Sequence, residues 1–547
     1  MAELPKPEEL AKIDYKPPEK GWMDTKPEFR EGIHCHAAGE KWLKTLDYPF
    51  PRTWSTYEED WKLPKNWKEI FLVGFNDRLN KYRSMRLFFD ICVRCGACAD
   101  KCQFFIGGGD PKNMPVLRAE LLRSLYRRYH TTAGKLLGSK LTGGRELTED
   151  VIKELYYYLY QCSECRRCSA FCPYGIDMAD LTILGRELLS SIGINIEWAM
   201  ASVGSCFKLG SHIGATPHAY KDMFEFFADE CEVVTGIRPR VPVNKKGAEI
   251  LYILPSGDYF ADPGTFNAMG QLLLFEYLDL DYTLSSYAAE GGNFGYFISH
   301  ETGKRLNAKF YAEAKRLGVK WILGGECGHM WRVVNQYMDT WNGPADFLEE
   351  PVSPITGTKF ENAKSTKMVH ICEFTADLIK HGKLKLDPSR NAHIILTFHD
   401  SCNPARAMGL FEEPRYIINN VLPPGHFYEM PENTIREKNF CCGSGSGFNG
   451  DEYLEIRLRG GFPRANAVRH VVNKYGVNHV GMICAIDRAV FPPLLDYWVP
   501  GCDLTGIHEL VGNALVFPGE RERVVDLRKR PLKGKEKEAA KFLEEIE

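Results

Sequence analysis

Two stretches decide the organisation of this chain: Cys92-Val-Arg-Cys95-Gly-Ala-Cys98-Ala-Asp-Lys-Cys102, and Cys162-Ser-Glu-Cys165-Arg-Arg-Cys168-Ser-Ala-Phe-Cys172, followed by Pro173. Both stretches have the spacing C-x2-C-x2-C-x3-C. Three thiolates on one tight loop reach three metal ions of a compact inorganic cluster, but the fourth lies too far along the chain to reach the same cluster. The fourth cysteine of each stretch is therefore expected to serve the other stretch.

This spacing is typical of [4Fe–4S] clusters, as in two-cluster ferredoxins. We assign one cluster to Cys92, Cys95, Cys98 and Cys172, and the other to Cys162, Cys165, Cys168 and Cys102. A pair of zinc knuckles is the alternative, but zinc sites usually combine two separated C-x2-C hooks or include histidine. Two such clusters in series move single electrons.

The sequence around the two stretches is helical. Apolar residues recur at three- and four-residue spacing over 116–130, 149–161 and 178–192. We therefore expect an all-helical two-cluster ferredoxin domain over residues 79–210. Before it, residues 1–78 are rich in proline and tryptophan, which suggests an arm that docks its rings on this chain or on a partner subunit. Residues 211–246 are expected to be a linker.

The second half of the chain alternates short apolar runs with helix-like stretches. The runs lie at 249–254, 319–323, 392–398 and 477–483, a pattern that favours α/β layers with parallel strands. Three pairs of segments resemble each other: 251–257 with 395–402, 289–292 with 441–444, and 322–327 with 481–487. The fold class predicted is a helical ferredoxin domain plus two repeated α/β domains, 247–385 and 386–515. A mixed-charge tail, 516–547, follows.

The repeat carries a further cysteine pattern. It consists of Cys402, the vicinal pair Cys441-Cys442 before Gly443, and Cys484, with Cys327 in the corresponding turn of the first repeat. Vicinal cysteines reach different irons of a cluster or bridge two of them, and glycine permits close backbone approach. The other cysteines are scattered, and we interpret them as buried thiols or idle surface residues: Cys35, Cys206, Cys231, Cys372 and Cys502.

Tandem ferredoxin motifs followed by two CCG-type repeats resemble the catalytic subunits of heterodisulfide reductases, the HdrD-like or CCG-domain family, and within it the DsrK-type subunits of DsrMKJOP complexes. The resemblance covers about residues 80–515. This sequence departs from the family at Asp487, which stands where the last cysteine of the second repeat would be, and the first repeat keeps only Cys327. The resemblance therefore implies a single special [4Fe–4S] cluster, cubane or noncubane, with the ligands Cys327, Cys402, Cys441, Cys442 and Cys484.

The resemblance also implies a function and partners. Menaquinol would supply electrons through an integral cytochrome b subunit (DsrM-like) of a larger complex, and the acceptor would be a disulfide or trisulfide on a DsrC-like protein in dissimilatory sulfur metabolism. Candidate proton donors and orienting groups are His399 and Asp400 beside Cys402, His329 beside Cys327, and Arg488 beside Cys484. Basic neighbours of the ferredoxin cysteines either tune the cluster potentials or are solvated: Arg94, Lys101, Arg166 and Arg167.

Composition excludes some classes. Sixty-nine basic against 72 acidic residues give a net charge of −3, so no basic field is present to hold a nucleic acid. No apolar run approaches the roughly 18 residues of a membrane span, and the start lacks a signal-peptide pattern. We expect a cytoplasmic protein, peripheral on the cytoplasmic side of the membrane through a partner. The alternatives are the iron–sulfur subunit of a flavin-dependent 2-hydroxy-acid or glycerol-3-phosphate dehydrogenase, and a non-catalytic electron-wiring subunit.

Overall fold

The computed structural model describes residues 63–290, 293–446, 454–518, 520 and 523–546. Most of the expected N-terminal arm, and Cys35 with it, lies outside the described residues. The chain divides into two compact units that each gather separate stretches of sequence. Unit 1 takes 1–204, 294–303 and 437–464, and unit 2 takes 205–293, 304–436 and 465–547.

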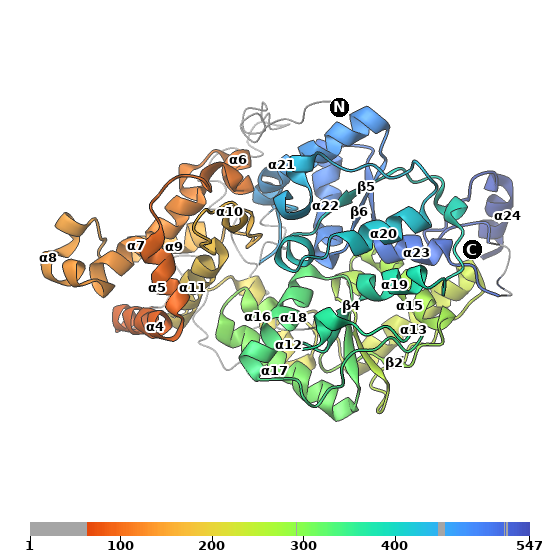
Figure 1. Cartoon of the computed structure of the whole chain (residues 1–547), viewed down its shortest axis with the longest axis horizontal. Coiled ribbons are helices and arrows are strands. Elements are labelled where there is room, and N and C mark those ends of the chain that lie inside the picture. Colours follow the sequence, from red (N-terminus) through yellow and green to blue (C-terminus); the bar gives the residue numbers. More distant parts are fainter. Residues whose placement is uncertain (1–62, 291–292, 447–453, 519, 521–522, 547) are drawn as a thin grey trace. The chain divides into compact units, whose positions relative to one another are not determined.

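The described part of unit 1 is helical (Figure 1). Its helices are α4 (Trp67–Lys81), α5 (Arg83–Ile91), η2 (Ala99–Lys101), α6 (Gln103–Gly108), η3 (Pro111–Asn113), α7 (Pro115–His130), α8 (Thr132–Thr142), α9 (Glu149–Leu159), α10 (Arg167–Ala170), α11 (Met178–Ser191), α16 (Asn293–Tyr296) and the first half of α21 (Leu454–Tyr475). Helix α12 (Glu197–Leu209) continues into unit 2. The predicted helices at 116–130, 149–161 and 178–192 correspond to α7, α9 and α11.

These three helices pack closely because α11 presents a glycine to the other two. A Cβ on Gly185 would lie 2.3 Å from Leu159 Cδ1 and 3.1 Å from Leu122 Cδ1, closer than packed atoms approach. Leu122 and Leu159 are themselves buried. The apolar faces of the helices thus form a core that holds the cysteine loops at their ends.

Unit 2 contains two parallel sheets with their helices. The first sheet has the order β2 (Tyr282–Thr283), β1 (Ile250–Ile253), β3 (Trp321–Gly324), β4 (Met368–His370), and the second has β5 (Leu396–His399), β6 (His479–Met482), β7 (Asp503–Gly506). The helices are α13 (Pro217–Thr235), α14 (Gly257–Phe260), α15 (Asp262–Tyr277), α17 (His300–Leu317), α18 (Gly328–Asn342), η4 (Glu361–Ala363), α19 (Ile371–Lys380), η5 (Pro388–Asn391), η6 (Asn403–Ala407), α20 (Glu412–Val421), η7 (Glu432–Thr434), η8 (Arg436–Lys438), α22 (Ala485–Trp498), α23 (Ile507–Ala514) and α24 (Glu536–Ile546). The first residues of α17 and the end of η8 are counted with unit 1.

The two sheets have the same internal order. Strand β3 lies between β1 and β4, with Ile250 opposite Trp321 and Ile322 opposite Met368; β6 lies between β5 and β7, with Leu396 opposite His479. The four apolar runs predicted from the sequence are the four strands β1, β3, β5 and β6. Their residues are buried on both faces, as is usual for parallel strands covered by helices.

A helical layer lies between the two sheets of unit 2, and Figure 1 shows α15, α19, α20 and α23 there. One hydrophobic core contains residues of both sheets and of these helices, among them Tyr252, Leu396 and Phe374. The approach of α15 to α23 requires glycine, because a Cβ on Gly270 would lie 1.9 Å from the His508 carbonyl oxygen. The two halves of unit 2 are therefore one packed body.

Two segments differ from the sequence expectation. The expected linker, 211–246, contains α13, which starts at a Thr216 cap and ends at Gly236 with φ +76°. Its residues Tyr220, Phe224 and Phe227 belong to the core of unit 2. The tail also contributes to this core through Val525, Leu527 and Ala539. Both segments are amphipathic, and their apolar faces are buried against the α/β layers.

No helix in the described ranges is long and apolar enough to cross a membrane. The apolar stretch near residues 270–284 is instead the buried helix α15 and the start of strand β2.

Candidate functional site

The first group of thiols in unit 1 surrounds a pocket after helix α5. Its lining includes four cysteines: Cys92, Cys95, Cys98 and Cys172. Cys92 ends α5, and the loop that follows turns through positive φ at Arg94 (56°) and Gly96 (81°). Burial raises the pKa of Cys98 to about 11, and the thiols of Cys172 and Cys92 act on it in the same direction. The fourth cysteine of the second stretch thus lies with the first three cysteines of the first stretch.

The second group gathers around a buried arginine of α7. The guanidinium of Arg118 forms a hydrogen bond with Cys102, and Cys162 and Cys168 lie within range of its charge. Cys165 approaches Gln103, the residue after Cys102, with 3.7 Å between Sγ and Oε1. The fourth cysteine of the first stretch therefore lies with the three cysteines of the second. This is the exchange of fourth ligands that the spacing predicts.

The loop of the second stretch is held in place by Arg186 of α11. Its guanidinium is fully buried and donates to Glu164 Oε1 at 2.7 Å and to the Cys162 carbonyl at 2.7 Å. Glu164 and Arg166 both have positive φ, 54° and 59°. A fixed ion pair thus stabilises the left-handed turn between Cys162 and Cys168.

The vicinal pair lies in unit 1, in contact with this second loop. Cys441 Sγ and Cys442 Sγ are 3.8 Å apart. The Cys441 amide donates to Gln103 Oε1 at 3.4 Å, and Cys441 Sγ lies 3.5 Å from Ser163 Oγ. Gln103 and Ser163 follow Cys102 and Cys162 directly in the sequence. The pair is therefore linked by hydrogen bonds to the residues beside the second thiol group.

Gly443 permits the turn after the vicinal pair. It has φ +88°, and a Cβ there would lie 2.4 Å from the Arg457 carbonyl oxygen and 2.5 Å from the Gly461 nitrogen, both in α21. No other residue fits both the backbone angle and the space. The CCG motif is thus a means of packing the thiols against a helix.

The basic neighbours named from the sequence fall into two kinds. Arg94 is exposed and pairs with Glu120 at 3.4 Å, and Lys101 pairs with Asp100 at 2.7 Å. Arg166 and Arg167 are buried. Arg166 pairs with Asp177 at 2.7 Å and with Asp180 at 3.1 Å. The guanidinium of Arg167 lies 3.9 Å from the centre of the Phe440 ring and donates to the Lys438 carbonyl.

In unit 2, two thiols occupy equivalent positions of the repeat. Cys327 precedes α18 and Cys484 precedes α22, both as N-cap residues with extended backbone. The structure therefore matches Cys327 with Cys484, whereas the sequence comparison matched it with Asp487. The amide of Gly328 donates to Cys484 Sγ at 3.3 Å, and the amide of Ala485 donates to the Glu326 carbonyl at 2.7 Å. Two helix N-termini thus face each other around two thiols.

A hydrogen bond between Cys327 and Cys484, with burial, raises the pKa of Cys484 well above its ordinary value. Cys402 belongs to the same region through the π-helix η6, which it precedes. A Cβ on Gly328 would lie 2.7 Å from Pro404 Cδ and 3.4 Å from Cys484 Sγ, so α18, η6 and Cys484 meet at this glycine. Asn403 Nδ2 lies 3.7 Å from Cys402 Sγ. Unit 2 therefore brings together three of the five predicted thiols, and unit 1 carries the vicinal pair.

The candidate proton donors differ in their surroundings. His399 is buried, and its Nε2 lies 3.3 Å from Asp487 Oδ2. Asp400 forms two 2.8 Å hydrogen bonds with Arg415. His329 is buried in the first turn of α18. Of these residues, only His399 combines an imidazole with an acidic neighbour close to the unit 2 thiols.

Arg488 lies in a buried ion network. It contacts Asp258 and donates to Glu326 Oε2 at 2.7 Å, and all three side chains are fully buried. Glu326 in turn contacts His508 Nδ1, while His508 Nε2 lies 2.7 Å from Thr375 Oγ1. Burial raises the pKa of Asp258 to about 6 even with Arg488 opposing it. Arg488 thus balances two buried carboxylates.

Glu326, Cys372 and His508 place three potential metal ligands within 4.8 Å of one another. Both ring nitrogens of His508 already have partners, and Glu326 is paired with Arg488. We interpret this group as part of the ion network, because a metal would have to displace these contacts. Cys372 is a buried thiol, as predicted for the scattered cysteines.

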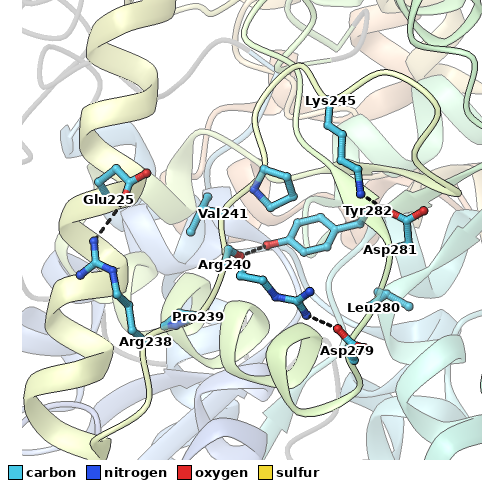
Figure 2. Close-up of a pocket in the computed structure, with 11 residues that line it drawn as sticks. Glu225, Arg238, Pro239, Arg240, Val241, Lys245, Asp279, Leu280, Asp281 and Tyr282 are labelled. Carbon is cyan, nitrogen blue, oxygen red and sulfur yellow. Dashed lines mark hydrogen bonds and ion pairs between the residues drawn. The ribbon is translucent and has the colours of Figure 1, made fainter.

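A separate surface crevice of about 600 Å³ lies beside β2. Figure 2 shows its ion pairs, Arg238 with Glu225 at 3.0 Å, Arg240 with Asp279 at 2.7 Å and Lys245 with Asp281 at 2.6 Å. The crevice is at the amino end of β2, whereas Cys327 follows the carboxyl end of the parallel strand β3. It therefore lies at the other edge of the sheet from the thiols.

The site residues that the sequence interpretation missed are polar groups from distant segments. Arg118 and Arg186 each occupy the apolar side of a helix, between buried residues, and a charge on an apolar stripe is the signal that indicates them. Gln103 and Ser163 have no comparable signal. Their importance depends on the approach of residue 441.

Fit to iron–sulfur clusters follows from the donors present. Each ferredoxin group offers four thiols and no histidine, which suits iron–sulfur clusters better than mixed zinc sites. Arg118 is a buried cation that forms no ion pair with a carboxylate of the described chain. An anionic cluster beside it would supply the missing negative charge.

Known proteins agree with these observations. The profile of the 4Fe–4S dicluster domain family matches residues 89–176, which confirms two [4Fe–4S] clusters in this part of the chain. No solved structure matches the chain.

Three curated relatives are similar to it. The Hdr-like menaquinol oxidoreductase iron–sulfur subunit 2 of Archaeoglobus fulgidus is 47% identical over 98% of this chain and 100% of its own length. The Hdr-like menaquinol oxidoreductase iron–sulfur subunit of Archaeoglobus profundus is 46% identical over the same shares. The dihydromethanophenazine:CoB–CoM heterodisulfide reductase of Methanosarcina mazei has a polypeptide that is 25% identical over 65% of this chain and 78% of its own length. The chain is a heterodisulfide reductase-like oxidoreductase subunit, and it belongs to the family of Hdr-like menaquinol oxidoreductase iron–sulfur subunits.

Proposed function

We propose that this chain is the catalytic iron–sulfur subunit, of DsrK type, of a complex that takes electrons from menaquinol through a cytochrome b partner (DsrM-like) and reduces a disulfide or trisulfide on a DsrC-like protein. The names of the relatives support both ends of this reaction, since two are menaquinol oxidoreductase subunits and one is part of a heterodisulfide reductase. The chain would act at the cytoplasmic side of the membrane.

We propose the ligand sets given by the sequence for the two ferredoxin clusters. Cys92, Cys95, Cys98 and Cys172 bind one, and Cys102, Cys162, Cys165 and Cys168 bind the other; the lining of the first pocket and the position of Arg118 support this division. When bound, the clusters of the chain supply one-electron transfer and, at the special cluster, a site for sulfur.

We further propose that Cys327, Cys402, Cys441, Cys442 and Cys484 bind the special [4Fe–4S] cluster, and that the two sheets of unit 2 are CCG-type repeats. Gly328 supports this assignment for the unit 2 thiols, because its missing side chain leaves room beside Cys484 and Pro404. The facing N-termini of α18 and α22 favour negative charge at Cys327 and Cys484. This is the environment that an anionic thiolate cluster requires.

The chain's own side chains have two tasks in this reaction. Gln103 and Ser163 orient Cys441 against the second thiol group, which keeps the vicinal pair close to the residues through which electrons reach it. Cleavage of a sulfur–sulfur bond takes two electrons and two protons and yields two thiols. His399, paired with Asp487, is the proposed proton donor for one of them.

The single observation that carries the proposal is the vicinal pair held against the second ferredoxin loop. The test is iron and acid-labile sulfide quantification on the anaerobic full-length protein. We expect about twelve irons in the wild type and about eight in the double variant Cys441→Ser, Cys442→Ser. The matched control is Cys502→Ser, a buried cysteine with no proposed ligand role, which should keep the wild-type count.

An unchanged count in the double variant would remove the special cluster from the proposal. Electron paramagnetic resonance tests the catalytic role separately. Oxidation of the protein in the presence of a thiol should give a signal that the double variant lacks, whereas a pure electron conduit gives only the spectra of ordinary cubane clusters.

A further inference from the structure

Arg118 is a buried charge whose hydrogen bonds to oxygen go to neutral groups. Its Nε donates to the Tyr158 carbonyl at 2.9 Å, and Nη2 donates to Asn113 Oδ1 at 2.7 Å and to the Gln161 carbonyl at 3.3 Å. Asn113 is itself fixed by a 2.8 Å hydrogen bond between its Nδ2 and Gln161 Oε1. The guanidinium is therefore held rigidly by backbone and amide groups, with no carboxylate of the described residues paired to it.

The charge of Arg118 acts on one thiol group only. Burial alone would lower the pKa of Arg118, but Cys102, Cys162 and Cys168 raise it above the ordinary value. Arg118 in turn lowers the pKa of Cys168 against a strong opposing effect of burial. All three cysteines belong to the second group.

Other cations around the second group are balanced or act in the same direction. Arg166 is paired with Asp177 and Asp180, and Arg186 with Glu164. Arg167, the residue before Cys168, is buried and donates to the Lys101 and Lys438 carbonyls. Arg118 and Arg167 therefore place positive charge on this side.

The first group has a different electrostatic environment. The main effects on Cys98 are burial, backbone amides and the neighbouring thiols, and no cation is among them. Arg94, the basic residue inside the first loop, is 57% exposed and pairs with Glu120, so solvent and Glu120 screen its charge. The two thiol groups thus differ by a buried positive charge.

We propose that Arg118 makes the cluster bound by Cys102, Cys162, Cys165 and Cys168 the higher-potential member of the ferredoxin pair, so that electrons collect at the thiol group beside Cys441. The proposal rests on the ligand assignment above. The step concerned is a one-electron exchange in which one cluster is oxidised, the other is reduced, and no bond is made or broken. Reduction adds one negative charge, and a fixed cation in a buried environment stabilises the reduced form.

The position of the vicinal pair gives this order its value. Gln103 and Ser163, which contact Cys441, follow Cys102 and Cys162 in the sequence. A higher potential at this group favours the electron on the side where sulfur chemistry is proposed. Arg118 is thus a positioning residue for charge and does not itself touch substrate.

The experiment is an anaerobic redox titration of the full-length protein followed by electron paramagnetic resonance. Cys95→Ser and Cys165→Ser change one ligand of each group and so assign each ferredoxin signal. We expect Cys165→Ser to alter the signal of higher midpoint potential. If it alters the lower one, the proposal is wrong, whatever the special cluster does.

Variants at Arg118 then test the cause. Arg118→Met should lower the midpoint potential of the second cluster and leave the first unchanged, and Arg118→Lys should lower it less because the charge is kept. The matched control is Arg123→Met, a buried arginine of the same helix that is paired with Glu120 at 3.0 Å, which should shift neither potential.

Iron content separates the possible failures. An Arg118→Met protein with full iron and unchanged potentials, or equal shifts in Arg118→Met and Arg118→Lys, would overturn the proposal. If Arg118→Met loses about four irons, Arg118→Lys decides: a shift confined to the second cluster supports a local charge effect, and equal shifts of both clusters exclude it. Failure of the ligand assignment would instead appear as Cys165→Ser or Cys95→Ser leaving both signals unchanged.

Discussion

At the scale of single residues, buried ionisable groups in unit 2 are kept in defined charge states by their surroundings. Arg488 balances Asp258 and Glu326 in a fully buried network. Replacement of one member of such a network leaves an uncompensated charge, which costs about 3–5 kcal/mol. Arg488, named from the sequence as a candidate beside Cys484, therefore has an evident structural task.

His370 provides a test of burial through pH. Its Nδ1 accepts a hydrogen bond from the Cys372 amide at 3.1 Å and caps α19, and burial lowers its pKa from 6.5 to about 3. Because the unfolded chain binds the proton more readily, the free energy of unfolding falls as the pH drops from about 6.5 toward 3, by up to about 1.4 kcal/mol per pH unit. Above pH 6.5 this contribution is complete.

We expect His370→Asn to keep the cap acceptor and reduce this pH dependence. The measurement is urea unfolding of the wild type and the variant at pH 7.5 and pH 5.5. The other buried histidines, among them His300 with a pKa of about 4, still titrate in the variant, so the slope becomes smaller and does not vanish. An identical slope in both proteins would show that His370 is not held neutral.

At the scale of elements, the site in unit 2 depends on two helices that start at cysteines. The N-termini of α18 and α22 both carry partial positive charge, and a cysteine is the N-cap residue of each. Gly328 is the first residue of α18 and is in close contact with Pro404 and Cys484. The arrangement of three thiols therefore depends on a residue without a side chain.

We expect Gly328→Val to displace η6 from α18, since even a Cβ would lie 2.7 Å from Pro404 Cδ. Iron should fall by about four per chain, while the two ferredoxin signals in electron paramagnetic resonance remain as an internal control. Full iron content and an unchanged signal of the special cluster would contradict the proposed role of the unit 2 thiols.

Elements with a strong pattern were predicted, and those with a weak pattern were not. Helices α7, α9 and α11 and strands β1, β3, β5 and β6 follow from apolar spacing. Strands β2, β4 and β7 were missed because they have two to four residues and their pairing comes from neighbours far along the chain. Helix α13 was taken for a linker because its position after the ferredoxin segment outweighed its apolar spacing.

At the scale of the whole molecule, the chain visits each unit more than once. Residues 437–464 return to unit 1 after most of unit 2 has been built. Arg186 helps to secure this return, because its Nη1 donates to Ser446 Oγ at 2.7 Å and to the Phe297 carbonyl at 3.4 Å as well as to Glu164. One buried side chain thus joins three separate segments of unit 1.

We expect Arg186→Met to destabilise unit 1 by about 3–5 kcal/mol, because Glu164 loses its partner while it stays buried. Hydrogen exchange followed by mass spectrometry should show faster exchange in peptides covering 437–446 and 162–165. Arg78→Met is the matched control, since Arg78 pairs at 2.6 Å with Glu187, the neighbour of Arg186, and is partly exposed.

The double variant Arg186→Met, Glu164→Met separates charge from packing. Removal of both charges should recover part of the lost protection, because no unpaired ion is then buried. Equal exchange in the single and double variants would mean that the ion pair is not what holds these loops.

The sequence by itself determined the two ferredoxin clusters and the change from helices to parallel α/β layers. Both are encoded in local spacing: the distance between cysteines limits which irons one loop can reach, and the period of apolar residues selects helix or strand. The tertiary structure alone decided that Cys327 matches Cys484, that the vicinal pair contacts the second ferredoxin loop, and that Arg118 and Arg186 are buried beside it. These relations join residues far apart in the chain, and their energies come from burial and from paired charges that exist only after the segments have packed.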